Sequence, residues 1–195
     1  QVESLGETSD FHYAVLEQAG RVSDGGKRSF LESLAHIDFT ALGEDYLARV
    51  QRRGKTAQRL IDKTPNNALY LGLIQKSLPE AKIIHVHKAP MDSCYSMFKA
   101  VFKNGYPFSY NLEKLGRYYI AFSEMMRQWR NHLPGHFLDF SYEQLVADQH
   151  RQTERLLAYC GLDWEDACLE FHKDKSATAT ASVIQVRQPI YGTSV

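Results

Sequence analysis

The alternation of apolar and polar residues predicts three short strands along the chain. Short runs rich in β-branched and aromatic residues, bounded by turn residues, are typical of strands. Runs of this kind occur at residues 57–63 (AQRLIDK), 81–87 (AKIIHVH) and 136–140 (HFLDF). Each is shorter than an ordinary helix, so we interpret all three as strands.

Helical periodicity fills most of the remaining chain. The longest helix is predicted over residues 111–134, with Asn111 as its N-cap and apolar residues along one face. Further helices are predicted at residues 10–18, 29–53, 65–78, 91–102, 141–148 and 150–160, with Ser141 as the cap of the fifth and Gly161 ending the sixth. The second of these is expected to break near residues 38–40 or at Gly43. Residues 173–195 have an irregular pattern.

Strands that alternate with helices indicate an α/β fold, with a parallel central sheet flanked by helices. The length of 195 residues predicts one domain spanning 1–195. Ligands of such sheets bind at the carboxyl ends of strands, beside helix N-termini. Two strand ends here have suitable chemistry, namely DKTPNN at residues 62–67 and HKAPMDSCYS at residues 87–96.

Composition narrows the classes of ligand. Apolar residues make up 44% and charged residues 24%, as in ordinary globular proteins. Because 23 basic and 23 acidic residues balance, the charge gives no reason to expect nucleic acid or an anionic membrane as a partner. We find no apolar run long enough to span a bilayer. An anionic ligand would therefore have to be held by a local cluster of cations.

The cysteine content indicates a reducing compartment. Cys94, Cys160 and Cys168 are odd in number and form no C-x-x-C pair, so we expect a cytoplasmic protein without a disulfide scaffold. No metal site is predicted, because His85 and His87 share a strand face but no third ligand is evident. Cys94 lies in a helix first turn, where a thiol pKa can fall, although packing within the helix is the simpler interpretation.

The segment HKAPMDSCYS has the features of an anion-binding turn. Lys88 places a full charge beside the N–H groups of a helix N-terminus, where phosphate binds readily. Ser96 adds a hydroxyl inside the helix, and Asp92 suits a cap or a brace. The alternative is an ordinary turn whose lysine and serine are simply solvated, and spacing alone leaves both interpretations open.

The segment IDKTPNN follows the same logic. Lys63 stands where a strand runs into a helix that opens with Pro65, although a surface lysine in a loop would look the same. A nucleoside-triphosphate site is not indicated, because the chain has no G-x-x-x-x-G-K-[ST] motif. The basic run at residues 49–59 is either a solvated face or a surface that attracts acidic acceptors.

Three stretches together resemble the sulfotransferase family, in the branch often fused to tetratricopeptide repeats and akin to tyrosylprotein sulfotransferases. They are DKTPNNALYLGLIQKSLPEAKIIHVHKAPMDSCYSMF, YEQLVAD and QVRQPIYGTSV. The resemblance implies a P-loop-NTPase-like sulfotransferase fold. It also implies transfer of a sulfuryl group from 3′-phosphoadenosine 5′-phosphosulfate to an acceptor hydroxyl, without a metal, and a tetratricopeptide region upstream.

The resemblance assigns roles to single residues. It implies that Lys88 and Ser96 hold the 3′-phosphate of the donor and that Tyr142, in SYEQL, lies near the adenine. His87 is a further candidate for supporting that phosphate.

The reacting group has its own set of residues. The resemblance implies that Lys63 stabilises the transferring sulfuryl group, with Ser182 before QVRQP in a similar role. It makes Glu7, in LGETSD, the base that activates the acceptor. As an alternative, Glu7 simply precedes and caps the helix at residues 10–18.

The chain departs from the family pattern in two respects. Lys88 stands where Arg is usual, and lysine lacks the planar fork that binds phosphate through two bonds. The 5′-phosphosulfate loop expected upstream is not in the sequence, so we expect a core fragment of the domain, truncated at both ends. A non-catalytic nucleotide- or protein-binding module is therefore the alternative function. Peptide tyrosine, carbohydrate and small-molecule acceptors, and the oligomeric state, all stay open.

Overall fold

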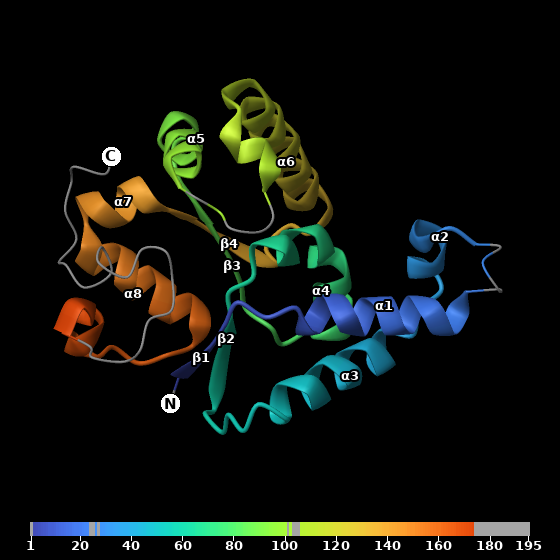
Figure 1. The fold of residues 1–195 in the computed structure, drawn as a ribbon. Helices are drawn as coiled ribbons and strands as arrows, with labels where there is room; N and C mark the ends of the chain where they lie inside the picture. The colour runs from blue at the N-terminus through green and yellow to red at the C-terminus, as the bar shows by residue number, and fades with distance from the viewer. Residues whose placement is uncertain (1, 24–25, 27, 101, 103–105, 174–195) are drawn as a thin grey trace. The chain divides into compact units, whose positions relative to one another are not determined.

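The computed structural model describes residues 2–23, 26, 28–100, 102 and 106–173. Helices joined by short strands make up most of this part of the chain (Figure 1). Contacts divide the chain into two compact units, residues 1–81 and 82–195, and each is described by itself. The expectation of a single domain over the whole chain stays a prediction.

The first unit contains one pair of parallel strands. Val2 lies opposite Arg59 and Ser4 opposite Ile61, and the register shifts before Gly6. Its elements are β1 (Val2–Gly6), α1 (Asp10–Val22), α2 (Phe30–Leu34), α3 (Phe39–Gln51), β2 (Arg59–Asp62), the 3-10 helix η1 (Pro65–Tyr70) and α4 (Leu71–Ser77).

The core of the first unit forms where α1 packs against α2 and α3. Phe11, Ala14 and Val15 recur at the three- and four-residue spacing that lines one helix face, and all three are buried. Ile37 and Leu42 complete the cluster. Burying a side chain the size of Phe11 stabilises the fold by roughly 1.5–3 kcal/mol.

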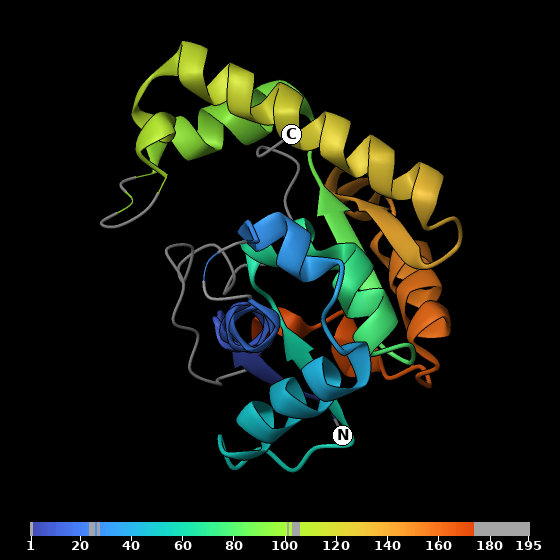
Figure 2. The same ribbon diagram turned by 90° about the vertical axis from the view of Figure 1, so that its right-hand side faces the viewer.

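The second unit contains the other pair of parallel strands. The register runs from Ile83 opposite Phe137 to His87 opposite Ser141. Its elements are β3 (Ile83–His87), α5 (Pro90–Lys99), η2 (Pro107–Tyr110), α6 (Leu112–His132), β4 (Phe137–Ser141), α7 (Tyr142–Ala147), α8 (Gln149–Cys160), η3 (Asp166–Cys168) and η4 (Phe171–Lys173). Helices α5 and α6 lie side by side in both views (Figure 1, Figure 2).

The structure confirms the mixed α/β fold and the parallel strands. All three strands predicted from the sequence are present, as β2, β3 and β4. The predicted caps are present too, because Asn111 accepts the N–H of Lys114 at 2.9 Å and Gly161 ends α8 with a φ of 64°. The short strand β1 was missed. Among the helices of the described residues, none is both long and apolar enough to cross a membrane.

Gly43 does not break a helix, which corrects one of the two predicted breakpoints. Helix α3 runs through it without interruption, and the break falls earlier, between α2 and α3. The physical reason is close packing of backbone against backbone. A Cβ atom at Gly43 would lie 2.3 Å from the carbonyl oxygen of Ser77, so only glycine allows α4 to approach this closely.

Candidate functional site

The carboxyl ends of β1 and β2 bring Glu7 and Lys63 together. Each residue directly follows its strand, and parallel neighbouring strands end at the same edge. Lys63 Nζ forms an ion pair with Glu7 Oε1. The two side chains are 56% and 59% exposed, and an ion pair this exposed contributes little to stability. Each of the two groups can therefore release the other and bind a ligand at a low cost in free energy.

Glu7 does not cap α1, which answers the alternative interpretation of this residue. The N-cap of α1 is Ser9, and within the described residues its side chain makes no capping bond. The backbone N–H of Asp10 is instead 3.4 Å from the hydroxyl of Thr8, which accepts it. The Glu7 carboxylate pairs with Lys63 and not with the N-terminus of α1.

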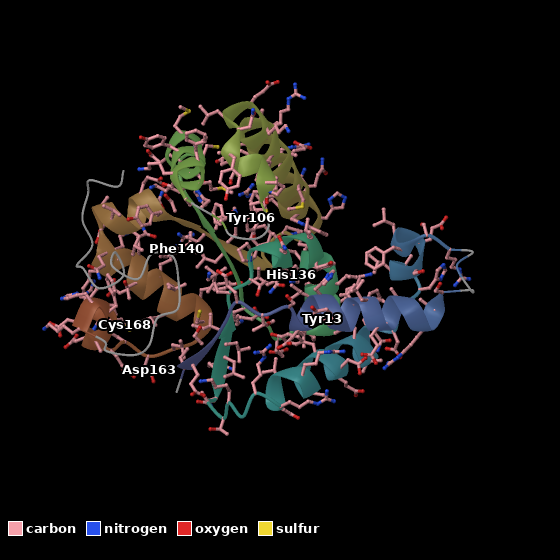
Figure 3. The ribbon with its side chains drawn as sticks, in the orientation of Figure 1. Tyr13, Tyr106, His136, Phe140, Asp163 and Cys168 are labelled. Atoms are coloured by element: carbon pink, nitrogen blue, oxygen red, sulfur yellow. The ribbon has the colours of Figure 1, made fainter. Side chains whose placement is uncertain are left out.

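The carboxyl ends of β3 and β4 bring Lys88 and Tyr142 together in the second unit. Lys88 directly follows β3, and Tyr142 opens α7 directly after β4. Lys88 Nζ lies 5.2 Å from the centroid of the Tyr142 ring, within the range of a cation–π contact. The buried strand residue Phe140, labelled in Figure 3, anchors β4 two positions before Tyr142. Two residues assigned separately to the donor are thus neighbours.

Glu143 is a site residue that the sequence interpretation missed. Its Oε1 accepts the backbone N–H of Ala89 at 2.7 Å, and its Oε2 accepts the hydroxyl of Ser141 at 2.8 Å. The bond from Ala89 lowers the pKa of the Glu143 carboxyl, so the group stays ionised. The available signal was its place beside Tyr142 in the YE pair, but nothing local showed which backbone group it holds.

Helix α5 begins at Pro90, one residue before the predicted start, with the proline at the first helical position. Asp92 lies in the first turn of the helix, but the N-cap is Ala89, so the interpretation of Asp92 as the cap was wrong. Ser96 lies in the second turn and is exposed. Ser182 falls outside the described residues.

An ion-pair network joins the middle of β3 and β4 to Arg130 of α6. The Nε and Nη2 groups of Arg130 donate to Asp139 at 2.7 and 2.9 Å, and His85 Nδ1 lies 2.7 Å from the same carboxylate. Arg130 is the main cause that lowers the pKa of Asp139 to about 2. Burial lowers the pKa of His85 in spite of its bond to Asp139, so this histidine is neutral near pH 7.

The His85–His87 pair shares one strand face, as its spacing predicts, with ring centroids 5.6 Å apart. In the part of the chain that the structure describes, no group of three or more metal-ligating side chains converges. Burial raises the pKa of the partly buried Cys94 thiol, which is opposite to the lowering that a helix first turn can cause.

The basic run at residues 49–59 is largely engaged within the first unit. Arg53 binds Asp10 through two nitrogens, at 2.5 and 2.9 Å. Arg49 binds Glu17, and Lys55 binds Glu3. These basic residues thus tie α3 and the turn after it to α1 and β1, so internal pairing accounts for much of the run.

The fold and the two clusters are typical of α/β proteins that bind an anionic ligand. Parallel strands end in lysines beside helix starts, which is the arrangement that binds anionic groups in α/β proteins. Comparison with known proteins gives the family. The model of the sulfotransferase family matches residues 7–166, so this chain belongs to the sulfotransferase family.

Two curated proteins are similar to this chain. It is 35% identical over 153 residues to an uncharacterized protein of Aquifex aeolicus (strain VF5), a match that covers 77% of this chain and 20% of that protein. It is 26% identical over 125 residues to a Caenorhabditis briggsae protein named "Putative protein-tyrosine sulfotransferase", covering 64% and 44%. The chain thus matches about a fifth of the first relative and less than half of the second.

Proposed function

We propose that this chain is the catalytic core of a sulfotransferase that moves a sulfuryl group from 3′-phosphoadenosine 5′-phosphosulfate to an acceptor hydroxyl. The observation that carries the proposal is the Glu7–Lys63 pair, in a chain that belongs to the sulfotransferase family. A carboxylate and an ammonium group at adjoining strand ends are the base and the cation that such a transfer needs.

The second unit supplies the residues that hold the donor. Lys88 contributes a positive charge to the 3′-phosphate, and the hydroxyl of Ser96 donates to the same group. The ring of Tyr142 offers a flat face for the adenine. The contact between Lys88 and Tyr142 supports this pairing of roles, because neighbouring groups can bind neighbouring parts of one nucleotide.

Glu7, Lys63 and Ser182 are assigned to the reacting groups. Glu7 takes the proton of the acceptor hydroxyl as its oxygen attacks the sulfur. The bond between sulfur and the bridging oxygen breaks, and 3′-phosphoadenosine 5′-phosphate leaves. Lys63 stabilises the charge that develops on the leaving oxygen, and Ser182 is assigned the same role. Lys63 supplies the positive charge in this scheme, so the step calls on no metal ion.

The ion pair between Glu7 and Lys63 sets an order for these events. While the two groups bind each other, Lys63 satisfies the carboxylate that has to accept a proton. A bound sulfuryl group offers Lys63 other oxygen partners and so releases Glu7 for the acceptor. The high exposure of both side chains makes this exchange inexpensive.

The acceptor is proposed to be a peptide tyrosine, with carbohydrate hydroxyls as the comparison. The support for tyrosine is the name of the Caenorhabditis briggsae relative. Acceptor choice resides in loops and differs among proteins of one fold, so both classes belong in the same assay.

The test uses the full-length protein in two measurements. Calorimetric titration with 3′,5′-bisphosphoadenosine measures donor-site binding, and transfer of radiolabelled sulfate to tyrosine peptides and oligosaccharides measures activity. We expect Glu7→Gln to lower kcat by about 10²–10⁴-fold with unchanged nucleotide affinity. The matched control is Glu17→Gln, which removes an acid of the same unit that pairs with Arg49 away from the strand ends.

Two results would count against the proposal. Full turnover by Glu7→Gln would exclude Glu7 as the base. Binding of 3′,5′-bisphosphoadenosine without transfer to either class of acceptor would favour the non-catalytic nucleotide-binding module.

A further inference from the structure

We propose that Asp62 is a positioning residue that fixes the Glu7–Lys63 pair, an inference that rests on the function proposed above. Asp62 is the last residue of β2 and directly precedes Lys63. Its Oδ2 accepts the hydroxyls of Tyr46 at 3.1 Å and Thr8 at 3.2 Å. Its Oδ1 lies 2.7 Å from the hydroxyl of Thr64. One carboxylate thus joins α3, the turn after β1 and the turn after β2.

The two threonines lock the turns to each other. The hydroxyl of Thr64 accepts the backbone N–H of Thr8 at 2.9 Å and lies 2.7 Å from the carbonyl oxygen of the same residue. A hydroxyl has one proton, so Thr64 shares it between that carbonyl and the Asp62 carboxylate. Thr8 is only 5% exposed, so water does not readily replace these bonds.

A backbone hydrogen bond also fixes the residues before Glu7 and at Lys63. The N–H of Lys63 donates to the carbonyl oxygen of Gly6 at 3.1 Å. Glu7 therefore stands between the anchored residues Gly6 and Thr8, and Lys63 stands between Asp62 and Thr64. The backbone of both residues is held on both sides, while their side chains are exposed. This is the arrangement that keeps two reacting groups in register without blocking a ligand.

The hydrogen bond from Tyr46 to Asp62 does not depend on pH in the ordinary assay range. Burial is the main cause that raises the pKa of its hydroxyl, and the nearby charge of Asp62 adds to it. Tyr46 therefore keeps its proton, and its donated bond to Asp62, throughout the pH range in which the enzyme would be assayed.

A positioning role differs from a purely structural one in what it changes. If Asp62 only joins β2 to α3, its loss lowers stability and leaves the turnover of the folded enzyme alone. If it positions the pair, its loss lowers kcat, because small displacements of reacting groups cost large factors in rate. Asp62→Asn keeps the shape of the side chain but replaces one acceptor oxygen with a donor, so it cannot satisfy all three hydroxyls.

We expect Asp62→Asn to lower kcat by roughly 10–100-fold with a small change in KM for the donor. Thr64→Val should also lower kcat. Thr64→Ser keeps the hydroxyl and should therefore keep kcat near the wild-type value. The matched control is Asp10→Asn, which removes the ion pair between Asp10 of α1 and Arg53 in the turn after α3 and leaves the bonds of Asp62 in place. An unchanged kcat in folded Asp62→Asn would overturn the proposal.

Amide hydrogen exchange tests the same inference without relying on activity. Protection should fall selectively at the N–H groups of Thr8 and Lys63 in Asp62→Asn, and should be kept in Asp10→Asn. A uniform loss across β1 and β2 would assign Asp62 a general structural role and overturn the proposal. If the wild-type protein transfers no sulfuryl group, the proposed function fails, while the exchange pattern still decides the role of Asp62.

Discussion

The carboxylate of Glu143 holds the backbone of Ala89, the residue directly after Lys88, through a bond of 2.7 Å from the Ala89 N–H. In a capping box the acid three residues into the helix accepts this N–H. Here Asp92 occupies that position, but an acid 54 residues along the chain takes its role. The backbone N–H of this turn is therefore held by an acid of α7 and not by an acid of its own helix.

The hydrogen bond from the Ala89 N–H to Glu143 is called the Glu143 brace below. Removing this brace should weaken binding of the donor. We expect Glu143→Ala to lower affinity for 3′,5′-bisphosphoadenosine by about tenfold, equal to ~1.4 kcal/mol, because Lys88 is then presented by a looser turn. Calorimetric titration measures the change. Glu154→Ala is the control, because Glu154 lies in an exposed contact with His150 on α8. Equal affinities for wild type and Glu143→Ala would show that the brace does not serve the site.

The brace should also respond to pH in a known direction. The bond from Ala89 is the main cause that holds the pKa of Glu143 below its ordinary value of 4.5. Because the folded-state pKa is depressed, the stabilisation from the carboxylate is present above about pH 4.5 and is lost as the pH falls below it.

Lys88→Arg should strengthen the proposed 3′-phosphate site. A guanidinium group binds phosphate through two parallel bonds, whereas an ammonium group acts as a point charge. We expect affinity for 3′,5′-bisphosphoadenosine to rise about 3–10-fold in Lys88→Arg and to fall at least tenfold in Lys88→Ala. The control is Lys99→Arg, since Lys99 also lies over a tyrosine ring, that of Tyr95, 4.3 Å away. No loss of affinity in Lys88→Ala would remove Lys88 from the site.

Two glycines in the first unit should respond in opposite ways to alanine. Gly43→Ala places a Cβ atom 2.3 Å from the Ser77 carbonyl oxygen, so α3 and α4 must separate, at a cost of about 1–3 kcal/mol. Gly20 is also helical but has no atom within 4 Å of such a Cβ, so Gly20→Ala should add up to ~1 kcal/mol of stability. Urea unfolding measures both changes. Equal effects at the two positions would contradict the close approach of α4.

The Asp139–Arg130 pair predicts a pH-dependent share of stability. Arg130 holds the pKa of Asp139 at about 2, below its unfolded value of about 3.9. This contribution is therefore present above pH ~4 and is lost as the pH falls toward 2. At pH 7 Asp139→Asn should cost about 1 kcal/mol, a figure reduced for solvent screening because the Asp139 side chain is 35% exposed.

Unfolding in urea at several pH values tests this prediction. The stability difference between wild type and Asp139→Asn should shrink below pH 4. Asp163→Asn is the control, because Asp163 is an exposed residue just after α8 (Figure 3). A difference that stays constant down to pH 2 would contradict the role of the Arg130 pair.

Local sequence was sufficient for most of the elements. The spacing of apolar residues gave the helices, and Asn111, Ser141 and Gly161 marked helix ends correctly, because caps depend on neighbours within a few positions. The strand β1 was missed. Its sequence VESLG is short and half-exposed, and it becomes a strand by pairing with β2, more than fifty residues away.

For the candidate site, too, part was determined by the sequence and part by the tertiary structure. The sequence by itself determined the residue types at the strand ends, including Glu7, Lys63, Lys88 and Tyr142, and their resemblance to the sulfotransferase family. Only the tertiary structure decided which of them are neighbours, and that Asp62 and Glu143 hold the turns that present them. The physical reason is that periodicity and capping are local, whereas the partner of a lysine or a backbone N–H at a strand end depends on which strands lie side by side.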